Sequence, residues 1–430
     1  MKLLIVYETV YPDFIGGVEH RNHELAVALC RRGHQVTLAG FCGDLASTVE
    51  NLSILSLGEL GAIYNRAGKR STRQALRFAA ALRRLDLTPY DAVETPNMPY
   101  VHLLPLAWKC AAAGKPLLVT WYEHWGAYWS GYVGRLRAPA YRAVEWLTSQ
   151  LGTAVTATSE LTRGRLASAR RRWWRRRGER GGEVELVPCG IAVARVRAAA
   201  GDRGEGGDGD GGDGNGGDGN GGKGRHGADD REGAAPLIYA GRLLAHKRLD
   251  LALRAVQLLA RGEGAAAAPP PPLLLTIFGE GPDRERLEAL AGELGIAGRV
   301  AFRGHVRSSE EVWRELGRAR LAVQPSAREG FGLFPLEAMA AGLPVVYCGS
   351  PESAVGELVR DGVEGVAVPA DPAALATALA ALLAPAGEAE RRRLGANAAA
   401  RAAPYDWEEI AERIEAICRD LIAGRDRRHR

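Results

Sequence analysis

The sequence predicts an α/β protein in which two doubly wound parallel sheets form two separate domains. The chain has 430 residues, more than one hydrophobic core usually holds. In both halves, short apolar runs alternate with stretches long enough for helices, which is the order of elements in parallel sheets. Between the halves, residues 201–233 contain sixteen glycines and no aliphatic side chain larger than alanine. Such a segment cannot bury enough apolar surface to fold, so we expect a disordered linker.

The first domain is expected to begin with a βαβ unit. Residues 2–10, KLLIVYETV, form a short run rich in branched apolar side chains, as in a buried strand. Val18, Leu25 and Leu29 then share one helical face. Gly33 is expected to end that helix. The remaining predicted strands of this half are residues 34–40 (HQVTLAG), 91–95 (DAVET), 116–121 (PLLVTW), 152–159 (GTAVTATS) and 184–190 (VELVPCG).

The second half repeats this pattern after the linker. Its five predicted strands lie in PLIYAG (236–241), PLLLTIFG (272–279), RVAFRGHV (299–306), RLAVQPS (320–326) and PVVYCG (344–349). A short helix is expected with Pro335 in its first turn, running through Ala341 and ended by Gly342. Apolar residues at helical spacing near the end of the chain predict an amphipathic terminal helix. The predicted units are 1–198 for the first domain, 199–234 for the linker, 235–403 for the second domain and 404–430 for the terminal helix, which is expected to cross back onto the first domain.

The composition is ordinary for a globular protein and argues against several other classes. Hydrophobic residues make up 46% of the chain and charged residues 25%, and no apolar run reaches the length of a membrane-spanning helix. The first apolar run is interrupted at Glu8, too early for a secretory signal, so we expect a cytoplasmic protein. The six cysteines form no CxxC pair and are expected to be reduced core thiols, and no metal site is predicted.

Two adjacent glycines, Gly16 and Gly17, lie between the first predicted strand and the first predicted helix. Without side chains they allow backbone amides to approach an anion, toward which the positive end of the helix dipole also points. A tight turn without any ligand would explain the paired glycines equally well.

Two cations, Arg242 and Lys247, follow the first predicted strand of the second half. The carboxyl ends of parallel strands form the edge at which such sheets bind ligands, so these cations could converge on a diphosphate. The alternative is a solvated basic loop without a ligand.

The segment AREGFGLFPLEAMAAGLPVV, residues 327–346, combines two carboxylates with a glycine-rich loop and a helix start. Gly330 and Gly332 allow the loop positive φ values, and the helix that follows offers unpaired amides to an anion. Free carboxylates repel phosphate, so Glu329 and Glu337 are better suited to accept hydrogen bonds from sugar hydroxyls. A ligand with a diphosphate between two sugars would satisfy all of these groups.

This segment resembles the E-x7-E signature of the retaining GT-B glycosyltransferases of family 4, with Glu329 and Glu337 as its two acids. The resemblance extends over nearly the whole chain outside the linker. The matching landmarks follow the family's order: GGVEHRNHELAVALCRRGHQVT, VPCGI, AGRLLAHKRLD, FGEGP, RVAFRGHV, QPSAREGFGLFPLEAMAAGLPVV and ELVRDGVEGVAV. The resemblance implies the GT-B fold, two Rossmann-like domains facing each other across a cleft, and transfer of a sugar from a nucleoside diphosphate donor to an acceptor.

The resemblance also implies a role for each matching residue. Arg242 and Lys247 would bind the diphosphate, and Glu337 would bind the ribose hydroxyls. Glu329 would hold the transferred sugar together with backbone amides of the glycine-rich loop. The remaining donor-binding candidates are Gly16, Gly17, Gly279, Gly281, Gly330, Phe331, Gly332 and Leu333.

One position departs from the family pattern. Members commonly have a histidine directly after the strand that reads LLVTW here, near the anomeric carbon, whereas this chain has Tyr122. Either His124 acts from a shifted position, or Glu123 and Tyr122 take over the contact. The catalytic candidates are therefore Glu329, Arg242, Lys247, His124 and Glu123.

The implied reaction displaces a nucleoside diphosphate from an anomeric carbon. Arg242, Lys247 and helix-end amides can stabilise the leaving group, so we expect neither a metal nor another cofactor. Retention of configuration is implied by the family alone. The acceptor is expected to be a carbohydrate, lipid-linked or a precursor of an extracellular polysaccharide. The alternatives are a nucleotide-sugar 2-epimerase on the same fold and a basic nucleic-acid-binding protein, which would leave both glutamates unexplained.

A basic segment, RLASARRRWWRRRGER, falls where a helix is expected between two strands of the first half. Arginines around Trp173 and Trp174 would suit an anionic membrane surface, with the rings at the headgroup level. This interpretation predicts peripheral contact with the inner face of a membrane through Arg170–Arg177. The alternative is a solvated helix with one tryptophan turned inward.

Overall fold

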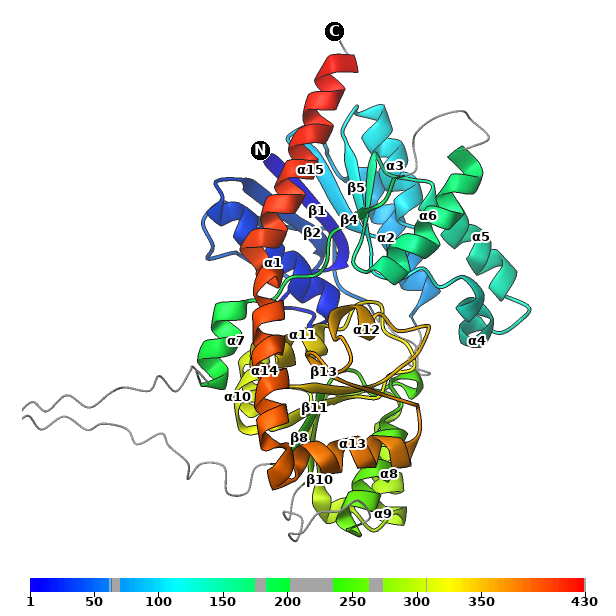
Figure 1. Ribbon diagram of the computed structural model, residues 1–430. Coiled ribbons are helices and arrows are strands. Elements are labelled where there is room, and N and C mark those ends of the chain that lie inside the picture. Colours follow the sequence, from blue (N-terminus) through cyan, green and yellow to red (C-terminus); the bar gives the residue numbers. More distant parts are fainter. Residues whose placement is uncertain are drawn as a thin grey trace, which may run out of the picture.

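A computed structural model of the chain confirms two α/β domains, each built on its own parallel sheet (Figure 1). The structure describes residues 1–61, 63, 70–174, 183–201, 235–262, 274–306 and 308–428, with the side chains of 171–174 and 425–428 excepted. Most of the predicted linker therefore lies outside the described residues.

The first domain contains a seven-stranded parallel sheet in the order β3-β2-β1-β4-β5-β6-β7. Successive side chains of a strand point to opposite faces, so Leu3 and Leu4 pack into different apolar clusters. Both faces of the sheet are therefore buried, as expected for parallel strands. The strands are β1 (Lys2–Thr9), β2 (Gln35–Phe41), β3 (Leu52–Ser56), β4 (Ala92–Pro96), β5 (Leu117–Trp121), β6 (Ala154–Ala157) and β7 (Glu185–Leu186).

Helices cover both faces of the first sheet. They are α1 (Gly17–Arg31), α2 (Thr72–Ala81), α3 (Leu103–Ala112), α4 (Trp129–Val133), α5 (Ala138–Ser149) and α6 (Glu160–Trp174). Helix α1 lies over one face, whereas α2, α3 and α6 contribute buried residues to the other. Gly33 has a φ of +84° and follows α1, where the sequence predicted the stop.

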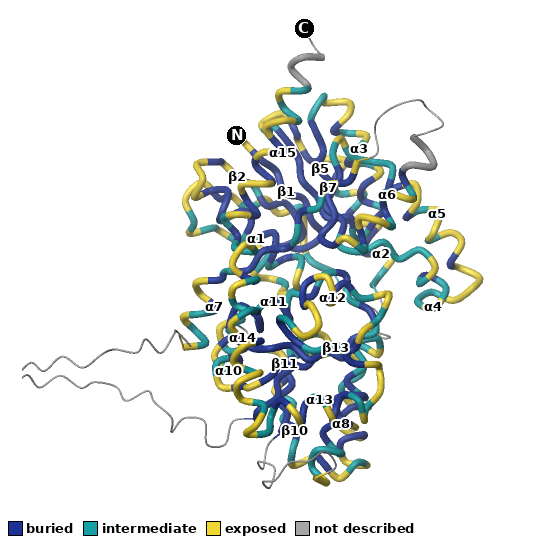
Figure 2. Tube along the Cα trace, viewed as in Figure 1, coloured by how far each residue is buried: buried dark blue, intermediate teal, exposed yellow. Residues whose placement is uncertain are grey.

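The second domain contains a six-stranded parallel sheet in the order β10-β9-β8-β11-β12-β13, the same winding as in the first domain. Figure 2 shows buried strands at the centre of both domains. The strands are β8 (Leu237–Ala240), β9 (Leu275–Phe278), β10 (Val300–Gly304), β11 (Leu321–Gln324), β12 (Val345–Cys348) and β13 (Gly365–Val368). The helices are α7 (Val193–Ala200), α8 (Leu249–Ala260), α9 (Arg284–Glu293), α10 (Ser309–Arg318), α11 (Leu333–Ala340), α12 (Val355–Leu358), α13 (Pro372–Leu383) and α14 (Glu388–Ala402).

The packing of α7 differs from the domain limit predicted at residue 198. Val193 and Val196 are buried in the apolar core of the second sheet, and α7 packs against α10. The chain therefore enters the second domain before α7. Composition could not locate this crossing, because the glycine-rich stretch begins only at residue 201.

The C-terminal helix α15 (Trp407–Arg428) lies against the first domain, and in Figure 1 it continues from α14 of the second domain onto the first. Ile410 and Ile414 are buried in the same apolar cluster as α1. Glu415 accepts a hydrogen bond from Arg32 Nε at 2.5 Å, next to His34. The terminal helix thus belongs structurally to the first domain.

The chain connects the two domains twice, and the two connecting segments are bonded to each other. Ile191 N donates to Tyr405 O at 2.8 Å, and Val193 N donates to a carboxylate oxygen of Asp406 at 3.1 Å. A Cβ atom placed on Gly190 would lie 2.6 Å from the Trp407 ring. The first crossing therefore packs directly on the second.

Two further expectations concern the cysteines and the membrane. All six cysteines are buried and free, as predicted.

Among the described residues, no single helix is both long and apolar enough to cross a bilayer, and one sharply bent pair, α13 with α14, meets the criteria of length and composition. Arg170 is buried and donates to Ser149 O at 2.5 Å, so its side chain is turned into the first domain. The side chains of residues 171–180 of the basic segment, including Trp173 and Trp174, lie outside the described residues.

Candidate active site

The loops that follow the strands of the two sheets meet between the domains. A Cβ atom placed on Gly17, after β1, would lie 3.4 Å from Leu333 Cδ1, after β11. The first turns of α1 and α11 therefore approach each other across the interface. The N-cap residues of the two helices are Gly16 and Gly332, neither of which has a side chain to cap the helix, although the carboxylate of Glu19 accepts a hydrogen bond from its own backbone amide in the first turn of α1. The start of α11 therefore offers its first backbone amides to an anion, close to the start of α1.

Lys247 and Glu329 meet at the centre of this region. Lys247 Nζ lies 2.5 Å from Glu329 Oε2, and Gln324 Nε2 donates to the same oxygen at 2.9 Å. Lys247 follows β8 and Glu329 follows β11, the two adjacent strands at which the order of the second sheet reverses. This switch point is where open α/β sheets bind ligands. The loops are also joined by the bond from Ala327 N to His246 O at 2.9 Å.

Arg242 and His246 lie on the same loop as Lys247. Arg242 is exposed, and His246 is partly buried. Burial and, to a smaller extent, the neighbouring Lys247 lower the pKa of His246 to about 4, so this imidazole is neutral near pH 7. Its ring contacts Tyr128 of the first domain with a centroid distance of 6.5 Å. The loop after β8 thus carries Arg242 and Lys247 beside a neutral imidazole, and the ring of that imidazole contacts the first domain.

Gly279 and Gly281 have a packing role that the sequence did not predict. Gly279 has a φ of +126°, and a Cβ atom there would lie 2.0 Å from Gly241 O. A Cβ atom on Gly281 would lie 2.2 Å from Leu243 O. The two glycines therefore let the loop after β9 lie backbone to backbone against the loop of Arg242. Their contact with a donor stays a prediction.

Glu337 is the second acid of the E-x7-E segment and lies on α11. Trp313 Nε1 of α10 donates to Glu337 Oε1 at 3.0 Å. Burial raises the pKa of the Glu337 carboxyl to about 7, although the bond from Trp313 opposes the shift. The carboxyl therefore changes its charge close to neutral pH. Phe331, on the loop before α11, packs against Tyr405 with ring centroids 6.1 Å apart.

We expect donor affinity to fall as the pH falls through about 7, because protonated Glu337 has lost an ionised acceptor for ribose hydroxyls. The KM for the donor should rise about tenfold below this pH. The same carboxyl contributes stability that is present below its ordinary pKa of 4.5 and lost as the pH rises through about 7. A Glu337→Gln variant should therefore show a flat KM profile and a higher melting temperature than wild type at pH 8. A wild-type KM that is independent of pH would contradict this assignment.

The three residues after β5 are Tyr122, Glu123 and His124, and their side chains point in different directions. The Tyr122 hydroxyl is buried, has no hydrogen-bond partner among the described residues, and interacts electrostatically with Arg21 and Cys189 inside the first domain. The His124 ring stacks on Trp121 at a centroid distance of 6.0 Å, and burial lowers its pKa.

Glu123 is the member of this group whose side chain reaches the second domain. A Cβ atom on Gly330 would lie 2.4 Å from Glu123 Cγ and 2.5 Å from Tyr122 O. Gly330 thus has no room for a side chain, because the first domain packs directly on its backbone. Of the alternatives left open by the sequence, the structure brings Glu123 nearest to the glycine-rich loop.

Four residues of this region were not predicted: Gln324, Trp313, His246 and Arg328. Gln324 is the last residue of β11, so its position at the ligand edge of the sheet was a usable signal. Trp313 lies on a different helix from its partner Glu337, and His246 and Arg328 make their contacts between domains. Sequence periodicity carries no information on such contacts.

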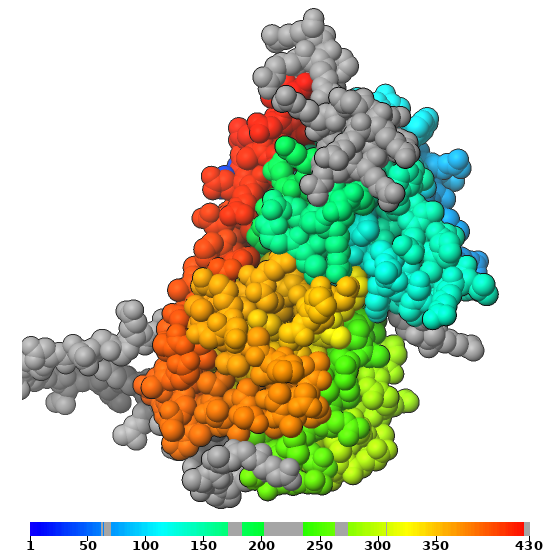
Figure 3. All heavy atoms as spheres, turned by 45° about the vertical axis from the view of Figure 1, so that its right-hand side comes forward, coloured from blue at the N-terminus to red at the C-terminus, as the bar shows by residue number. Residues whose placement is uncertain are grey.

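The interface around the site is extensive. The Glu357 carboxylate, before β13, accepts hydrogen bonds from the backbone amides of Glu160 at 2.7 Å and Leu161 at 2.6 Å, the first residues of α6. Figure 3 shows the atoms of this part of the second domain, yellow to orange, in direct contact with the green α6. A carboxylate at a helix start stabilises the contact through the helix dipole.

Fold and site together define a GT-B protein of the nucleotide-sugar-dependent glycosyltransferase class: two Rossmann-like domains bring a cation, a carboxylate and two helix starts to one switch point. Two family patterns agree with this class. Residues 15–195 match Glycosyltransferase Family 4, and residues 228–401 match Glycosyl transferases group 1. The chain therefore belongs to glycosyltransferase family 4, the group 1 glycosyltransferases, and is a transferase.

Individual proteins show the same likeness. A glycogen synthase of Mycobacterium tuberculosis is 27% identical over 429 residues, which cover 96% of this chain and 92% of that protein. Sucrose-phosphate synthase from Thermosynechococcus elongatus superposes with a TM-score of 0.72 at 22% identity, over 98% of this chain and 99% of that one. The Anabaena protein HepE, in complex with UDP-glucose, superposes with a TM-score of 0.67 at 16% identity, over 98% of this chain and 100% of that one. At these identities the superpositions show a shared fold.

Proposed function

We propose that the protein transfers a glycosyl residue from a nucleoside diphosphate sugar to a carbohydrate acceptor, with retention of configuration and without a divalent metal ion. The observation that carries this proposal is the 2.5 Å contact between Lys247 and Glu329 at the switch point of the second sheet. A cation beside a carboxylate suits the two parts of a donor, its phosphate and its sugar hydroxyls. The UDP-glucose complex of HepE and the glycogen synthase relative support this class of donor.

The cations and the helix starts act on the leaving group. As the bond between the anomeric carbon and the phosphate oxygen breaks, its electron pair passes to the diphosphate, which gains negative charge. Lys247, Arg242 and the first amides of α11 stabilise that charge, and they are in place before the reaction begins. These groups supply the positive charge that a metal ion provides in other enzymes.

The carboxylates act on the sugars. Glu329 accepts hydrogen bonds from hydroxyls of the transferred sugar, and donor binding replaces its direct contact with Lys247. Glu337, oriented by Trp313, accepts hydrogen bonds from the ribose when ionised. With retention, the acceptor hydroxyl attacks the face that the diphosphate leaves, so its proton passes to a phosphate oxygen as the new bond forms.

A donor panel tests the proposal directly. Purified protein is incubated with UDP-glucose, ADP-glucose, GDP-mannose and UDP-N-acetylglucosamine, with and without oligosaccharide acceptors, in buffer containing EDTA. We expect nucleoside diphosphate release that depends on the acceptor and an α-linked product by proton NMR. Activity that EDTA abolishes would refute metal independence, and a β-linked product from an α-linked donor would refute retention.

The same experiment separates the rival enzyme class. A nucleotide-sugar 2-epimerase would convert its nucleotide sugar without any acceptor, and the converted sugar would appear in the NMR spectrum. Failure of every donor to bind, measured as an unchanged melting temperature at millimolar nucleotide, would refute the donor class itself.

A further inference from the structure

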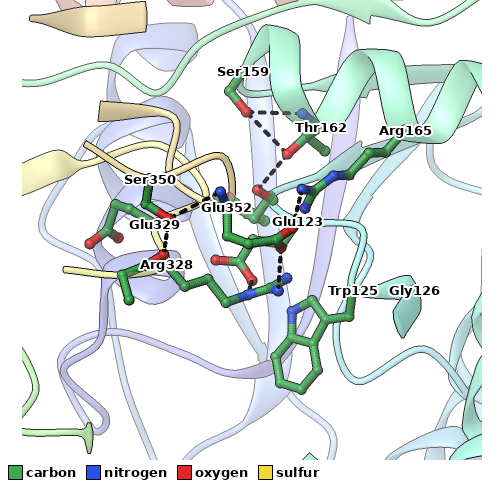
Figure 4. A network of polar contacts seen from close by, with 12 residues as sticks. Glu123, Trp125, Gly126, Ser159, Thr162, Arg165, Arg328, Glu329, Ser350 and Glu352 are labelled. Atoms are coloured by element: carbon green, nitrogen blue, oxygen red, sulfur yellow. Dashed lines mark hydrogen bonds and ion pairs between the residues drawn. The ribbon is translucent and has the colours of Figure 1, made fainter. Parts of the chain in front are cut away.

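Arg328 connects the glycine-rich loop of the second domain to the first domain. Only 5% of this residue is exposed. Its Nε donates to Glu123 Oε2 at 3.0 Å, and its Nη1 donates to Glu352 Oε2 at 3.2 Å (Figure 4). The guanidinium carbon also lies 4.1 Å from the centroid of the Tyr128 ring and 5.5 Å from that of Trp125. Three of these four partners belong to the first domain.

Arg328 directly precedes Glu329, yet their side chains point to opposite sides. Arg328 enters the first domain, whereas Glu329 meets Lys247 and Gln324 of the second. The backbone between them is held in an extended pairing, in which Glu329 N donates to Glu352 O at 3.3 Å and Ala354 N donates to Glu329 O at 2.9 Å. Because a single peptide unit joins the two residues, the placement of the Arg328 backbone constrains that of Glu329.

The geometry points to Arg328 as a positioning residue for the transfer reaction: its contacts with Glu123 and Tyr128 set the position of Glu329 and of the Gly330 amide when the two domains are closed. This inference rests on the proposed function. A planar guanidinium suits the role, because it can bind carboxylates and stack on aromatic rings simultaneously. The two carboxylates bind its N–H groups, and the aromatic rings restrict its orientation.

The interface offers a matched control in Arg165 of α6. Arg165 Nη2 donates to Glu352 Oε1 at 2.8 Å, so it forms an ion pair across the same interface with the same carboxylate as Arg328. It has no chain connection to the glycine-rich loop. Loss of Arg165 should loosen the domain contact without displacing Glu329.

The test compares Arg328→Ala, Arg328→Lys, Glu123→Gln and Arg165→Ala with wild type in the full chain. We expect Arg328→Ala to lower kcat about a hundredfold, because a small displacement of a substrate-holding group has an effect of this size. The dissociation constant for UDP, measured by calorimetry, should change less than about threefold, since Lys247 and Arg242 remain. Arg328→Lys should recover part of kcat, and Arg165→Ala should change it less than about threefold.

Hydrogen exchange without any donor gives an independent readout. Arg328→Ala should increase exchange in residues 122–128 of the first domain as well as in residues 327–333. Unchanged exchange in residues 122–128, or equal losses of kcat in Arg328→Ala and Arg165→Ala, would overturn the inference. If wild type turns over none of the sugar donors, the proposed function fails, whereas the exchange data still decide whether Arg328 holds the two loops together. If Arg328→Ala fails to fold, Arg328→Lys and Glu123→Gln carry the comparison.

Discussion

Replacing Lys247 by alanine should lower kcat about 100- to 1000-fold, the size of effect seen when one preorganised electrostatic group is removed. The variant loses the cation that stabilises the leaving diphosphate. It also leaves Glu329, whose side chain is only 16% exposed, without the ammonium group 2.5 Å from its carboxylate. Without its cation, the Glu329 carboxylate keeps, within the described part of the chain, only the hydrogen bond from Gln324 and repels the phosphate of the donor. Steady-state kinetics with the best donor of the panel measure this loss.

Lys109→Ala is the control for this prediction. Lys109 is half-buried on α3 and donates to Arg83 O at 2.8 Å, within the first domain and away from the interface. Its replacement should leave kcat unchanged. A Lys247→Ala variant that retains more than about a tenth of wild-type kcat would show that the leaving group is stabilised elsewhere.

Replacing Gly279 by alanine should destabilise the second domain by about 3 kcal/mol or more, one of the largest effects expected from a single methyl group. The new Cβ would lie 2.0 Å from Gly241 O, so one of two paired loops must move, and the φ of +126° adds backbone strain. Urea unfolding followed by circular dichroism should show the transition of the second domain at a lower urea concentration.

A Gly295→Ala variant separates the two causes of the destabilisation expected in Gly279→Ala, which are the close approach of the loops and the backbone strain. Gly295 has a φ of +69°, and a Cβ atom there would have no neighbour within 4 Å. This variant should lose only about 1 kcal/mol, the cost of a positive φ in a residue with a side chain. Equal losses in the two variants would mean that backbone strain, and not the close approach of the loops, is the reason for glycine at residue 279.

The fold could be predicted largely because its central strands are continuous apolar runs. The two strands that were missed, β3 and β13, are edge strands. Exposed and partly exposed residues make up most of β3, and β13 begins with Gly365, so neither forms a long apolar run. Gly365 is required because a Cβ atom there would lie 2.1 Å from Val345 O, a contact that exists only once the sheet has formed.

The site could be predicted in part for a topological reason. Lys247 and Glu329 are far apart in the sequence, but both follow strands, and the carboxyl ends of parallel strands share one edge of a sheet. Their 2.5 Å contact follows from the adjacency of β8 and β11. The contacts of Arg328 depend on how two domains pack, which no periodicity within one domain encodes. The rise in the pKa of Glu337 depends likewise on burial beside α10.

The two crossings of the chain between the domains have a mechanical consequence. Ile191 N donates a hydrogen bond to Tyr405 O, so the two connecting segments are held together. We expect them to act as one hinge, about which the two domains rotate without sliding along it. The nucleoside diphosphate product should leave when this rotation opens the cleft between the domains. The rate of steady-state turnover would then depend on residues far from the reacting atoms. Variants at Gly190 or Trp407 should then change the steady-state kcat, while the rate of transfer measured in a single turnover stays unchanged.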